Sequence, residues 1–232
     1  MIMKKYEFQD NAVDWLYEKT VDPLSKKTIV MSAPTGSGKT IILIRYIDKL
    51  LESNKNCAIV WLCPGKGNLE EQSRESFDHF LPTRNSFDLN DVLLNGFTVG
   101  STSFINWDKV TKKGNKAITE NEKDNLYDKI KLAHNEGIQF IIIIDEEHEN
   151  TYKSEQNPKY QTKEVAEYLS ELKGCKVILG SATPSIETYY RALTGEMKLL
   201  ELNSRVDNKP MPPMKVIDMR NELKGGNKSL FS

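Results

Sequence analysis

The chain has 232 residues, and 32 Lys and Arg against 33 Asp and Glu give a formal net charge of −1 at pH 7. This length suffices for one large α/β domain with a complete hydrophobic core. The near-neutral charge excludes a uniformly basic, histone-like nucleic-acid binder, but it is compatible with binding through a local basic patch. The sequence has no run of about 18 apolar residues, which excludes a transmembrane helix.

The cysteines and the first residues indicate a cytoplasmic protein. Cys57, Cys63 and Cys175 form no paired C-x-x-C spacing, so we expect reduced core thiols rather than disulfides or metal ligands. Residues 1–8 lack the apolar segment of a secretory signal peptide. We therefore predict a cytoplasmic protein that contacts no membrane.

The first predicted element is a helix that begins within residues 8–16, where Ala12 and Leu16 have helical spacing. Gln9 lies at its start. A glutamine side chain can accept a hydrogen bond from the exocyclic amine of adenine and donate one to a ring nitrogen. Because a glycine-rich loop follows, we predict that Gln9 recognises adenine. The alternative is an ordinary solvated glutamine on a helix.

Residues 33–40, Ala-Pro-Thr-Gly-Ser-Gly-Lys-Thr, lie between an apolar run at 28–31 and a stretch with helical spacing. This order predicts a phosphate-binding loop, although Ala33 replaces the glycine with which the pattern usually starts. Lys39 is expected to reach the β- and γ-phosphates of ATP, and the Thr40 hydroxyl to bind Mg²⁺. The predicted nucleotide-binding residues of the loop are Pro34, Thr35, Gly36, Ser37, Gly38, Lys39 and Thr40.

Residues 57–62 form a continuous apolar run, which predicts a central parallel strand. Pro64, Gly65 and Lys66 follow it, at the edge of the sheet where α/β proteins bind ligands. Lys66 is therefore a candidate contact to a nucleic-acid phosphate. The alternative is an ordinary loop between a strand and a helix.

Another short strand is predicted at residues 97–101. The hydroxyls of Ser101, Thr102 and Ser103 would then lie at its end, where they are candidate contacts to nucleic-acid phosphates. Residues 108–136 follow and are rich in charged and amide side chains of mixed sign. They predict a solvated, charged insertion with one amphipathic helix near its end.

Residues 140–144 give the strongest strand signal, because β-branched side chains dominate them. Asp145 follows directly, and a carboxylate at the end of a buried strand beside a phosphate loop suits Mg²⁺ coordination. Glu146 is then placed to orient and deprotonate the attacking water. His148 is expected to couple the site to its neighbours through hydrogen bonds. Lys39, Glu146 and His148 are the predicted catalytic residues.

Residues 162–173 predict an amphipathic helix in which Val165, Leu169 and Leu172 share a face, ended by Gly174. A strand is then expected at 176–180, with Ser181-Ala182-Thr183 at its end. We predict that the hydroxyls of Ser181 and Thr183 relay the nucleotide state to the grip on a nucleic-acid strand.

The last part of the chain has a different composition. Residues 204–232 contain the run Lys-Pro-Met-Pro-Pro and then a Gly-Gly pair. We predict a linker and tail there, with one further strand at 214–219, leading toward an absent second lobe.

In this order, Gln9, the loop at 33–40, Pro64–Lys66, Asp145–His148 and Ser181–Thr183 resemble the first RecA-like lobe of the superfamily 2 DEAD/DEAH-type helicases. The set of motifs covers nearly the whole chain.

The finer resemblance differs between two parts of the chain. Residues 145–232 look most like the primosomal replication-restart helicases of the PriA type, to whose pattern Tyr152 and Lys153 also belong. Residues 1–144 look more like the helicase subunit of type III restriction enzymes. Our hypothesis is a composite, or a divergent member that joins features of both near Ile144.

The resemblance implies an α/β fold: a RecA-like P-loop NTPase domain, with a mostly parallel sheet and helices on both faces. Residues 1–203 would form the ATP-binding lobe of a DNA helicase that uses ATP and Mg²⁺. Its partners would be single-stranded, forked or duplex DNA and a second RecA-like lobe beyond residue 232, which supplies arginine fingers. The isolated lobe is expected to bind ATP and to hydrolyse it slowly.

Two other functions remain open at this stage. One is a duplex DNA translocase of the type III restriction kind, which moves along DNA without unwinding it. The other is a nucleotide-binding module without catalysis, against which Glu146 argues. A small-molecule P-loop kinase would have no use for Asp145–His148 or Ser181–Thr183.

Overall fold

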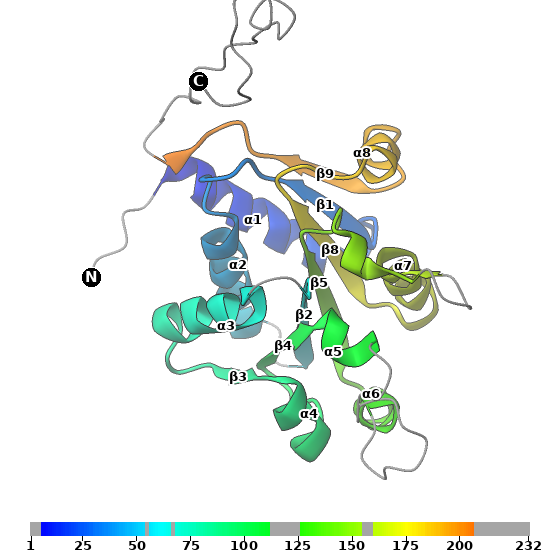
Figure 1. Ribbon diagram of the computed structural model, residues 1–232. Helices are drawn as coiled ribbons and strands as arrows, with labels where there is room; N and C mark the ends of the chain where they lie inside the picture. Colours follow the sequence, from blue (N-terminus) through cyan, green and yellow to red (C-terminus); the bar gives the residue numbers. More distant parts are fainter. Residues whose placement is uncertain (1–5, 54–55, 66–67, 112–125, 155–159, 207–232) are drawn as a thin grey trace, which may run out of the picture.

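The computed structural model describes residues 6–53, 56–65, 68–111, 126–154 and 160–206. Its centre is a seven-stranded sheet in which all neighbouring strands run parallel (Figure 1). The strands in order across the sheet are β3 (Asn85–Phe87), β4 (Ser101–Asn106), β2 (Cys57–Cys63), β5 (Gln139–Asp145), β8 (Lys176–Ser181), β1 (Thr28–Ser32) and β9 (Lys198–Glu201).

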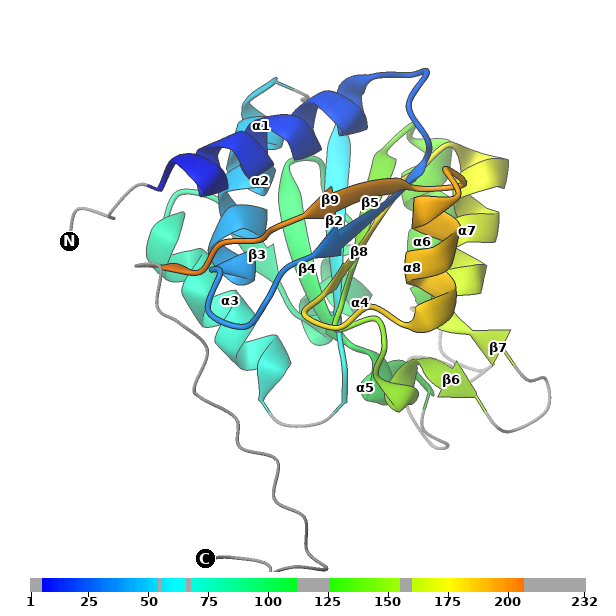
Figure 2. The same ribbon diagram turned by 90° about the horizontal axis from the view of Figure 1, so that it is seen from above.

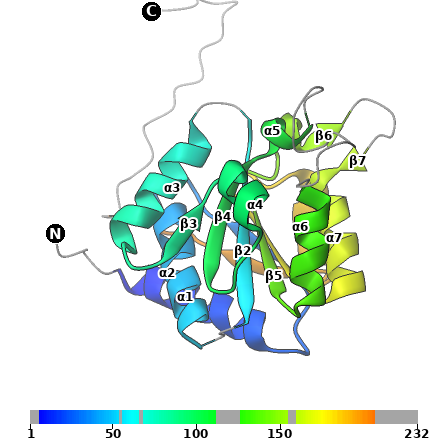
Figure 3. The same ribbon diagram turned by 90° about the horizontal axis from the view of Figure 1, so that it is seen from below.

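Helices cover both faces of this sheet, as the views from above and below show (Figures 2 and 3). Each face has its own cluster of buried apolar side chains. The helices of the first face are α1 (Glu7–Val21), α2 (Lys39–Ser53) and α3 (Leu69–Phe80). Those of the second are α4 (Leu89–Asn95), α5 (Trp107–Thr111), α6 (Leu126–Asn135), α7 (Thr162–Lys173) and α8 (Ile186–Leu193). The predicted fold class is confirmed.

The isoleucine run makes β5 a central strand. Ile141 and Ile143 belong to the first cluster, whereas Ile142 and Ile144 pack with the second. Successive side chains of a strand point to opposite faces, so a strand covered on both faces must be apolar throughout. At its carboxyl end Asp145 pairs with Gly180 of β8. The segments that follow β1, β5 and β8 therefore meet at one edge of the sheet.

A smaller unit follows β5. It consists of the 3₁₀ helix η2 (Asn150–Tyr152) and the antiparallel strands β6 (Lys153–Ser154) and β7 (Tyr160–Gln161). No helix in the described part of the chain has both the length and the apolarity that crossing a membrane requires.

The strand predicted at residues 97–101 is wrong, because β4 begins only at Ser101. Gly100 has a φ of 76°. The N–H and hydroxyl of Ser101 both donate to the Thr98 carbonyl, over 3.3 and 2.6 Å. These bonds close a turn over a stretch that an apolar pattern alone predicts as extended.

The bounds predicted for α7 are confirmed, and Gly174, with a φ of 75°, ends the helix. Its buried face consists of the small residues Thr162, Ala166 and Ser170. Val165 and Leu169 are each 41% exposed. Small side chains at every fourth position let the helix lie close to the sheet, which leaves the larger side chains facing outward.

Several predictions fall outside the described residues. They concern Lys66, the part of the insertion at 112–125, and the linker and tail from residue 207 on, with the strand at 214–219. The helix expected late in the insertion is present as α6.

Candidate active site

The predicted phosphate loop connects β1 to α2 at the carboxyl edge of the sheet. Gly36 and Gly38 both have a φ of 84°, which strains any residue that carries a side chain. Ala33 is buried, and its N–H donates to the Ser181 carbonyl over 2.9 Å. Because its φ is not among the positive values of the described residues, alanine replaces glycine there without backbone strain.

Lys39 meets the two carboxylates that follow the isoleucine run. Its ammonium nitrogen Nζ lies 2.8 Å from Asp145 Oδ1 and also contacts Glu146 Oε1. Burial alone would lower the pKa of Lys39, but Asp145 and Glu146 together outweigh it and hold the pKa above its ordinary value of 10.5. The lysine is therefore kept charged at a point where a phosphate can replace a carboxylate as its partner.

Asp145 has the chemistry of a magnesium ligand, and the role of Thr40 stays a prediction. Asp145 is only 7% exposed, and the partner of its Oδ1 is the Lys39 ammonium, 2.8 Å away. A buried carboxylate oxygen is a ligand that Mg²⁺ prefers. Among the residues that the structure places, no three Asp, Glu, His or Cys side chains gather. In proteins, Mg²⁺ is usually held by one or two carboxylates together with phosphate and water.

Glu146 is held in a strained backbone conformation. Its φ of 52° is the single positive value among the described residues other than glycine, and such strain concentrates at functional sites. The Ser181 hydroxyl donates to Glu146 Oε2 over 3.3 Å, and His148 Nδ1 lies 2.7 Å from the same hydroxyl oxygen. The Thr183 N–H donates to Ser181 Oγ over 3.0 Å. One chain of hydrogen bonds thus joins Glu146, His148, Ser181 and Thr183, but Thr183 takes part through its backbone N–H, and the role of its hydroxyl stays a prediction.

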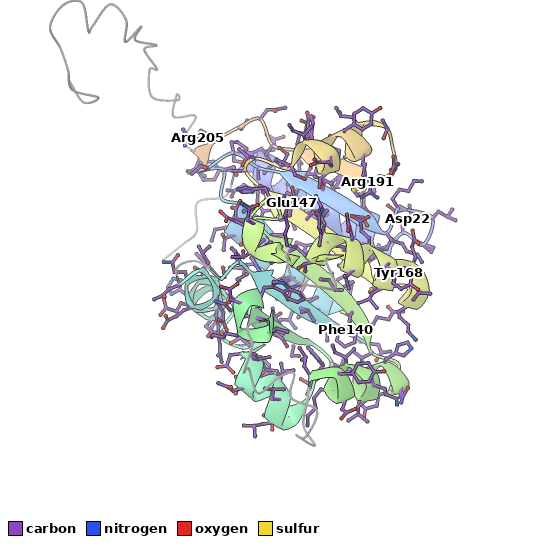
Figure 4. All side chains as sticks on the ribbon, turned by 45° about the vertical axis from the view of Figure 1, so that its right-hand side comes forward. Asp22, Phe140, Glu147, Tyr168, Arg191 and Arg205 are labelled. Atoms are coloured by element: carbon purple, nitrogen blue, oxygen red, sulfur yellow. The ribbon has the colours of Figure 1, made fainter. Side chains whose placement is uncertain are left out.

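Glu147 has a role that the sequence analysis missed (Figure 4). Its side chain is 0% exposed, although it carries a charge. Oε1 accepts a hydrogen bond from the Ser185 N–H over 2.6 Å, and Lys163 Nζ lies 3.4 Å from Oε2. Lys163 also donates to the hydroxyls of Ser185 and Thr188. Glu147 therefore ties the segment after β5 to the N-terminus of α8 and to α7. Only these partners reveal the role of Glu147, because its residue type does not distinguish it from Asp145 and Glu146, the two acids before it.

The Tyr152 hydroxyl joins the carboxyl ends of two central strands, β2 and β5. Its buried hydroxyl lies 3.0 Å from the Leu62 carbonyl and 2.8 Å from the Asp145 carbonyl, so the two carbonyls share its one proton. Burial raises the pKa of Tyr152 far above its ordinary value, so the hydroxyl stays a donor. The carbonyls at the ends of β2 and β5 are thereby held side by side.

Gln9 lies against the phosphate loop. Its side chain is buried, and Nε2 donates to the Ser37 carbonyl over 2.9 Å. A Cβ at Gly38 would come within 2.5 Å of that nitrogen, so only glycine leaves room for this contact. The bond to Ser37 is additional to the predicted contact with adenine, which stays a prediction.

The predicted nucleic-acid contacts are not brought together with these residues. Ser101, Thr102 and Ser103 lie inside β4 with 0% of their surfaces exposed. Since they face no surface that a phosphate could reach, the prediction for these three residues is wrong. Lys66 lies outside the described residues.

One protein family matches the chain over most of its length. The sequence model of this family, described as the type III restriction enzyme, res subunit, matches residues 2–186. The chain belongs to this family.

Replication restart proteins PriA from several bacteria are similar to this family member. The protein from Bacillus subtilis (strain 168) is 35% identical over 214 residues, which are 92% of this chain and 25% of that protein. The protein from Synechocystis sp. is 31% identical over an aligned length of 223 residues, and the match covers 92% of this chain and 24% of that protein. The chain therefore spans about a quarter of the length of these curated relatives.

Both resemblances expected from the sequence are found, but they overlap instead of meeting at Ile144. The restriction-enzyme family continues to residue 186, and the PriA relatives match 92% of the chain. A composite joined at Ile144 is therefore not supported.

A solved structure of the UvsW helicase from bacteriophage T4 has a similar fold. The TM-score is 0.50 at 12% identity, and the likeness covers 86% of this chain and 61% of that chain. At this identity it shows the fold alone, and it agrees with a RecA-like architecture.

Proposed function

We propose that this chain is the ATP-binding motor lobe of an ATP-dependent DNA helicase of the replication-restart type. Such a lobe couples ATP hydrolysis to movement along DNA or to strand separation. The observation that supports this most is the contact of Lys39 with Asp145 and Glu146, which unites the phosphate loop and two carboxylates in one site. The similarity to PriA over 92% of the chain supports the replication-restart type.

In this proposal, ATP enters between the loop and the carboxylates. Lys39 exchanges Asp145 and Glu146 for oxygens of the β- and γ-phosphates, and the N-terminus of α2 adds its positive dipole end. Thr40 and Asp145 would hold Mg²⁺, which would offset charge on the phosphates. Gln9 contacts the adenine edge.

Glu146, released from Lys39, accepts a proton from the water that attacks the γ-phosphorus. The bond from this phosphorus to the bridging oxygen breaks, and ADP leaves with the electron pair. Because Ser181 donates to Glu146 and also contacts His148, a change at Glu146 alters this chain of hydrogen bonds. Ser181 and Thr183 thereby pass the nucleotide state to the segment that leads to α8.

The proposal also names the partners. DNA, single-stranded or forked, is the substrate, and a second RecA-like lobe from residues beyond 232 supplies arginine fingers. In related NTPases such an arginine accelerates phosphoryl transfer by about 10³–10⁵, so the chain alone would turn over slowly. Restart of replication takes place at the chromosome, so the proposal places the protein in the bacterial cytoplasm.

ATP binding and hydrolysis by this chain test the proposal, measured alone and with single-stranded or forked DNA, beside Glu146→Gln. We expect both proteins to bind ATP with Mg²⁺ and the substituted chain to lose at least about 10² of any turnover. If DNA stimulated ATP hydrolysis by this chain, and Glu146→Gln abolished it, the lobe would be a motor that needs no second lobe. If neither protein bound ATP, the proposal would be wrong.

One observation favours a second candidate function within the same chemistry. The matching family is described as the type III restriction enzyme, res subunit, which points to a translocase on duplex DNA. ATP turnover by the whole protein that rises with duplex but not with forked DNA would favour this candidate. If the whole protein bound nucleotide but did not hydrolyse it, both the helicase and the duplex translocase would be excluded.

A further inference from the structure

The segment that follows β9 runs along the phosphate loop. In Figure 2 the orange trace after β9 lies beside the blue loop between β1 and α2. Leu202 N–H donates to the Ser32 carbonyl over 2.9 Å, which extends the pairing of β9 with β1 toward the loop. Arg205 and Val206 then reach the loop itself. The sequence analysis gave these two residues no role beyond a linker.

Three successive carbonyls of the loop are bonded by residues from outside it. Arg205 Nε donates to the Thr35 carbonyl over 2.7 Å, and the Val206 N–H donates to the Gly36 carbonyl over 3.0 Å. The third carbonyl, that of Ser37, accepts from Gln9. Because closely packed carbonyls need partners, α1 and the segment after β9 both hold the loop, and Gln9 and Val206 both approach Gly38.

These bonds determine where the loop directs its N–H groups. In a trans peptide, the carbonyl of one residue and the N–H of the next point in opposite directions. The bond to the Thr35 carbonyl therefore also fixes the direction of the Gly36 N–H, and the bond to the Ser37 carbonyl does the same for the Gly38 N–H. A phosphate loop binds an anion through N–H groups that are fixed in this way.

The guanidinium of Arg205 also packs against the loop, at Gly36. A Cβ built on Gly36 would lie 3.3 Å from both Nε and Nη2 of Arg205. Glycine at this position thus permits the positive φ and the close approach of the arginine. Because an arginine is charged at every accessible pH, it also adds a positive charge next to the phosphate site.

We propose that Arg205 is a positioning residue of the nucleotide site. Together with the Val206 N–H, it holds the loop in its phosphate-binding shape from the outside. The inference rests on the proposed function, because it assumes that residues 33–40 bind a nucleoside phosphate. It also means that the segment after β9, through Arg205 and Val206, is bonded directly to that loop.

The test compares the unsubstituted chain with Arg205→Ala, Arg205→Lys and the control Arg191→Ala. Arg191 is also half-exposed and ion-paired, with Glu167 and Glu196, but it lies on α8 away from the loop. Arg205→Ala is expected to weaken binding of a fluorescent ADP with Mg²⁺ by about tenfold, as the loss of a charged hydrogen-bond donor predicts. Arg205→Lys should recover part of the affinity, and Arg191→Ala should match the unsubstituted chain.

Hydrogen exchange without nucleotide gives the second readout. Amides of residues 35–39 should exchange faster in Arg205→Ala and at the unsubstituted rate in Arg191→Ala, while the circular dichroism spectrum and thermal midpoint stay unchanged. Equal ADP affinity and equal exchange in Arg205→Ala would overturn the inference. If the unsubstituted chain bound no nucleotide, the proposed function would fail. The amide exchange of residues 35–39 would then be the remaining test of Arg205. Equal exchange in Arg205→Ala and the unsubstituted chain would overturn the inference.

Discussion

Lys39 begins α2 and Asp145 ends β5, yet Lys39 Nζ and Asp145 Oδ1 lie 2.8 Å apart. The strand that precedes α2 is β1, and it does not adjoin β5 in the sheet, because β8 lies between them. The parallel register of these three strands brings the ends of β1 and β5 to the same level. The ion pair is thus a product of the assembled sheet, and its strength can be measured as part of the free energy of unfolding.

Lys39→Met should lower the free energy of unfolding by about 3 kcal/mol at neutral pH, because it leaves the buried carboxylate of Asp145 and the half-buried one of Glu146 without their cation. The pKa of Lys39 is raised from 10.5 in the folded chain. Its contribution is therefore complete below pH 10.5 and is lost as the pH rises through the higher folded value.

Urea unfolding at about pH 7, 9 and 11 measures this contribution as the difference between the two proteins. The difference should be equal at the two lower values and smaller at the highest. Lys49→Met is the matched control on α2, because the ion pair of Lys49 with Asp14 is exposed and should contribute under about 1 kcal/mol. A difference that does not shrink above pH 10.5 would contradict the raised pKa.

Glu146→Gly should be more stable than Glu146→Ala by about 1 kcal/mol, because alanine keeps the strain of a positive φ and glycine does not. At an ordinary helix or strand position the order is reversed. Chemical unfolding of both variants measures the difference, and both should lack ATP turnover. Equal stabilities, or a more stable alanine variant, would show that the backbone at Glu146 is relaxed.

Glu147→Ala should cost about 3–5 kcal/mol of unfolding free energy, because it leaves Lys163 enclosed without its anionic partner. Glu147→Gln keeps an acceptor for the Ser185 N–H and should cost less. In a double-mutant cycle, Lys163→Met should cost less in the Glu147→Ala background than alone. Additive costs in urea unfolding would mean that the two charges do not interact.

Gln9→Ala separates the adenine contact from the contact with Ser37. Loss of the bond to Ser37 should weaken ATP and GTP binding alike, and if Gln9 also reads adenine, ATP binding should weaken about fivefold more than GTP binding. Titration of both nucleotides measures this. A loss of equal size for ATP and GTP would assign Gln9 to the loop alone, through its bond to the Ser37 carbonyl.

Much of the fold follows from local pattern. The isoleucines at 141–144 require a strand covered on both faces, and the spacing at 162–173 defines α7 with its glycine end. The phosphate loop and Asp145 could be predicted because each directly follows a buried strand. In a parallel sheet the carboxyl ends of strands meet at one edge, so these residues could be expected to converge without knowing the strand order.

The errors and omissions have physical causes that lie outside local pattern. The start of β4 depends on the turn closed by Ser101 on Thr98. In α7 the small residues Thr162, Ala166 and Ser170 face the sheet, so the larger Val165 and Leu169 face outward. Glu147 and Arg205 matter through partners far away in sequence. Hydrogen bonds between distant segments leave no periodic signal in a single sequence.

The position of β1 in the sheet has a consequence for synthesis. Its neighbours are β8 and β9, with Thr28 beside Val177 and Leu200 beside Met31. On the ribosome, β1 therefore has no strand to pair with until residues 176–201 have emerged. Contacts between residues so distant in sequence form slowly. The phosphate loop is among the first segments to be translated, but it is among the last to acquire its native surroundings.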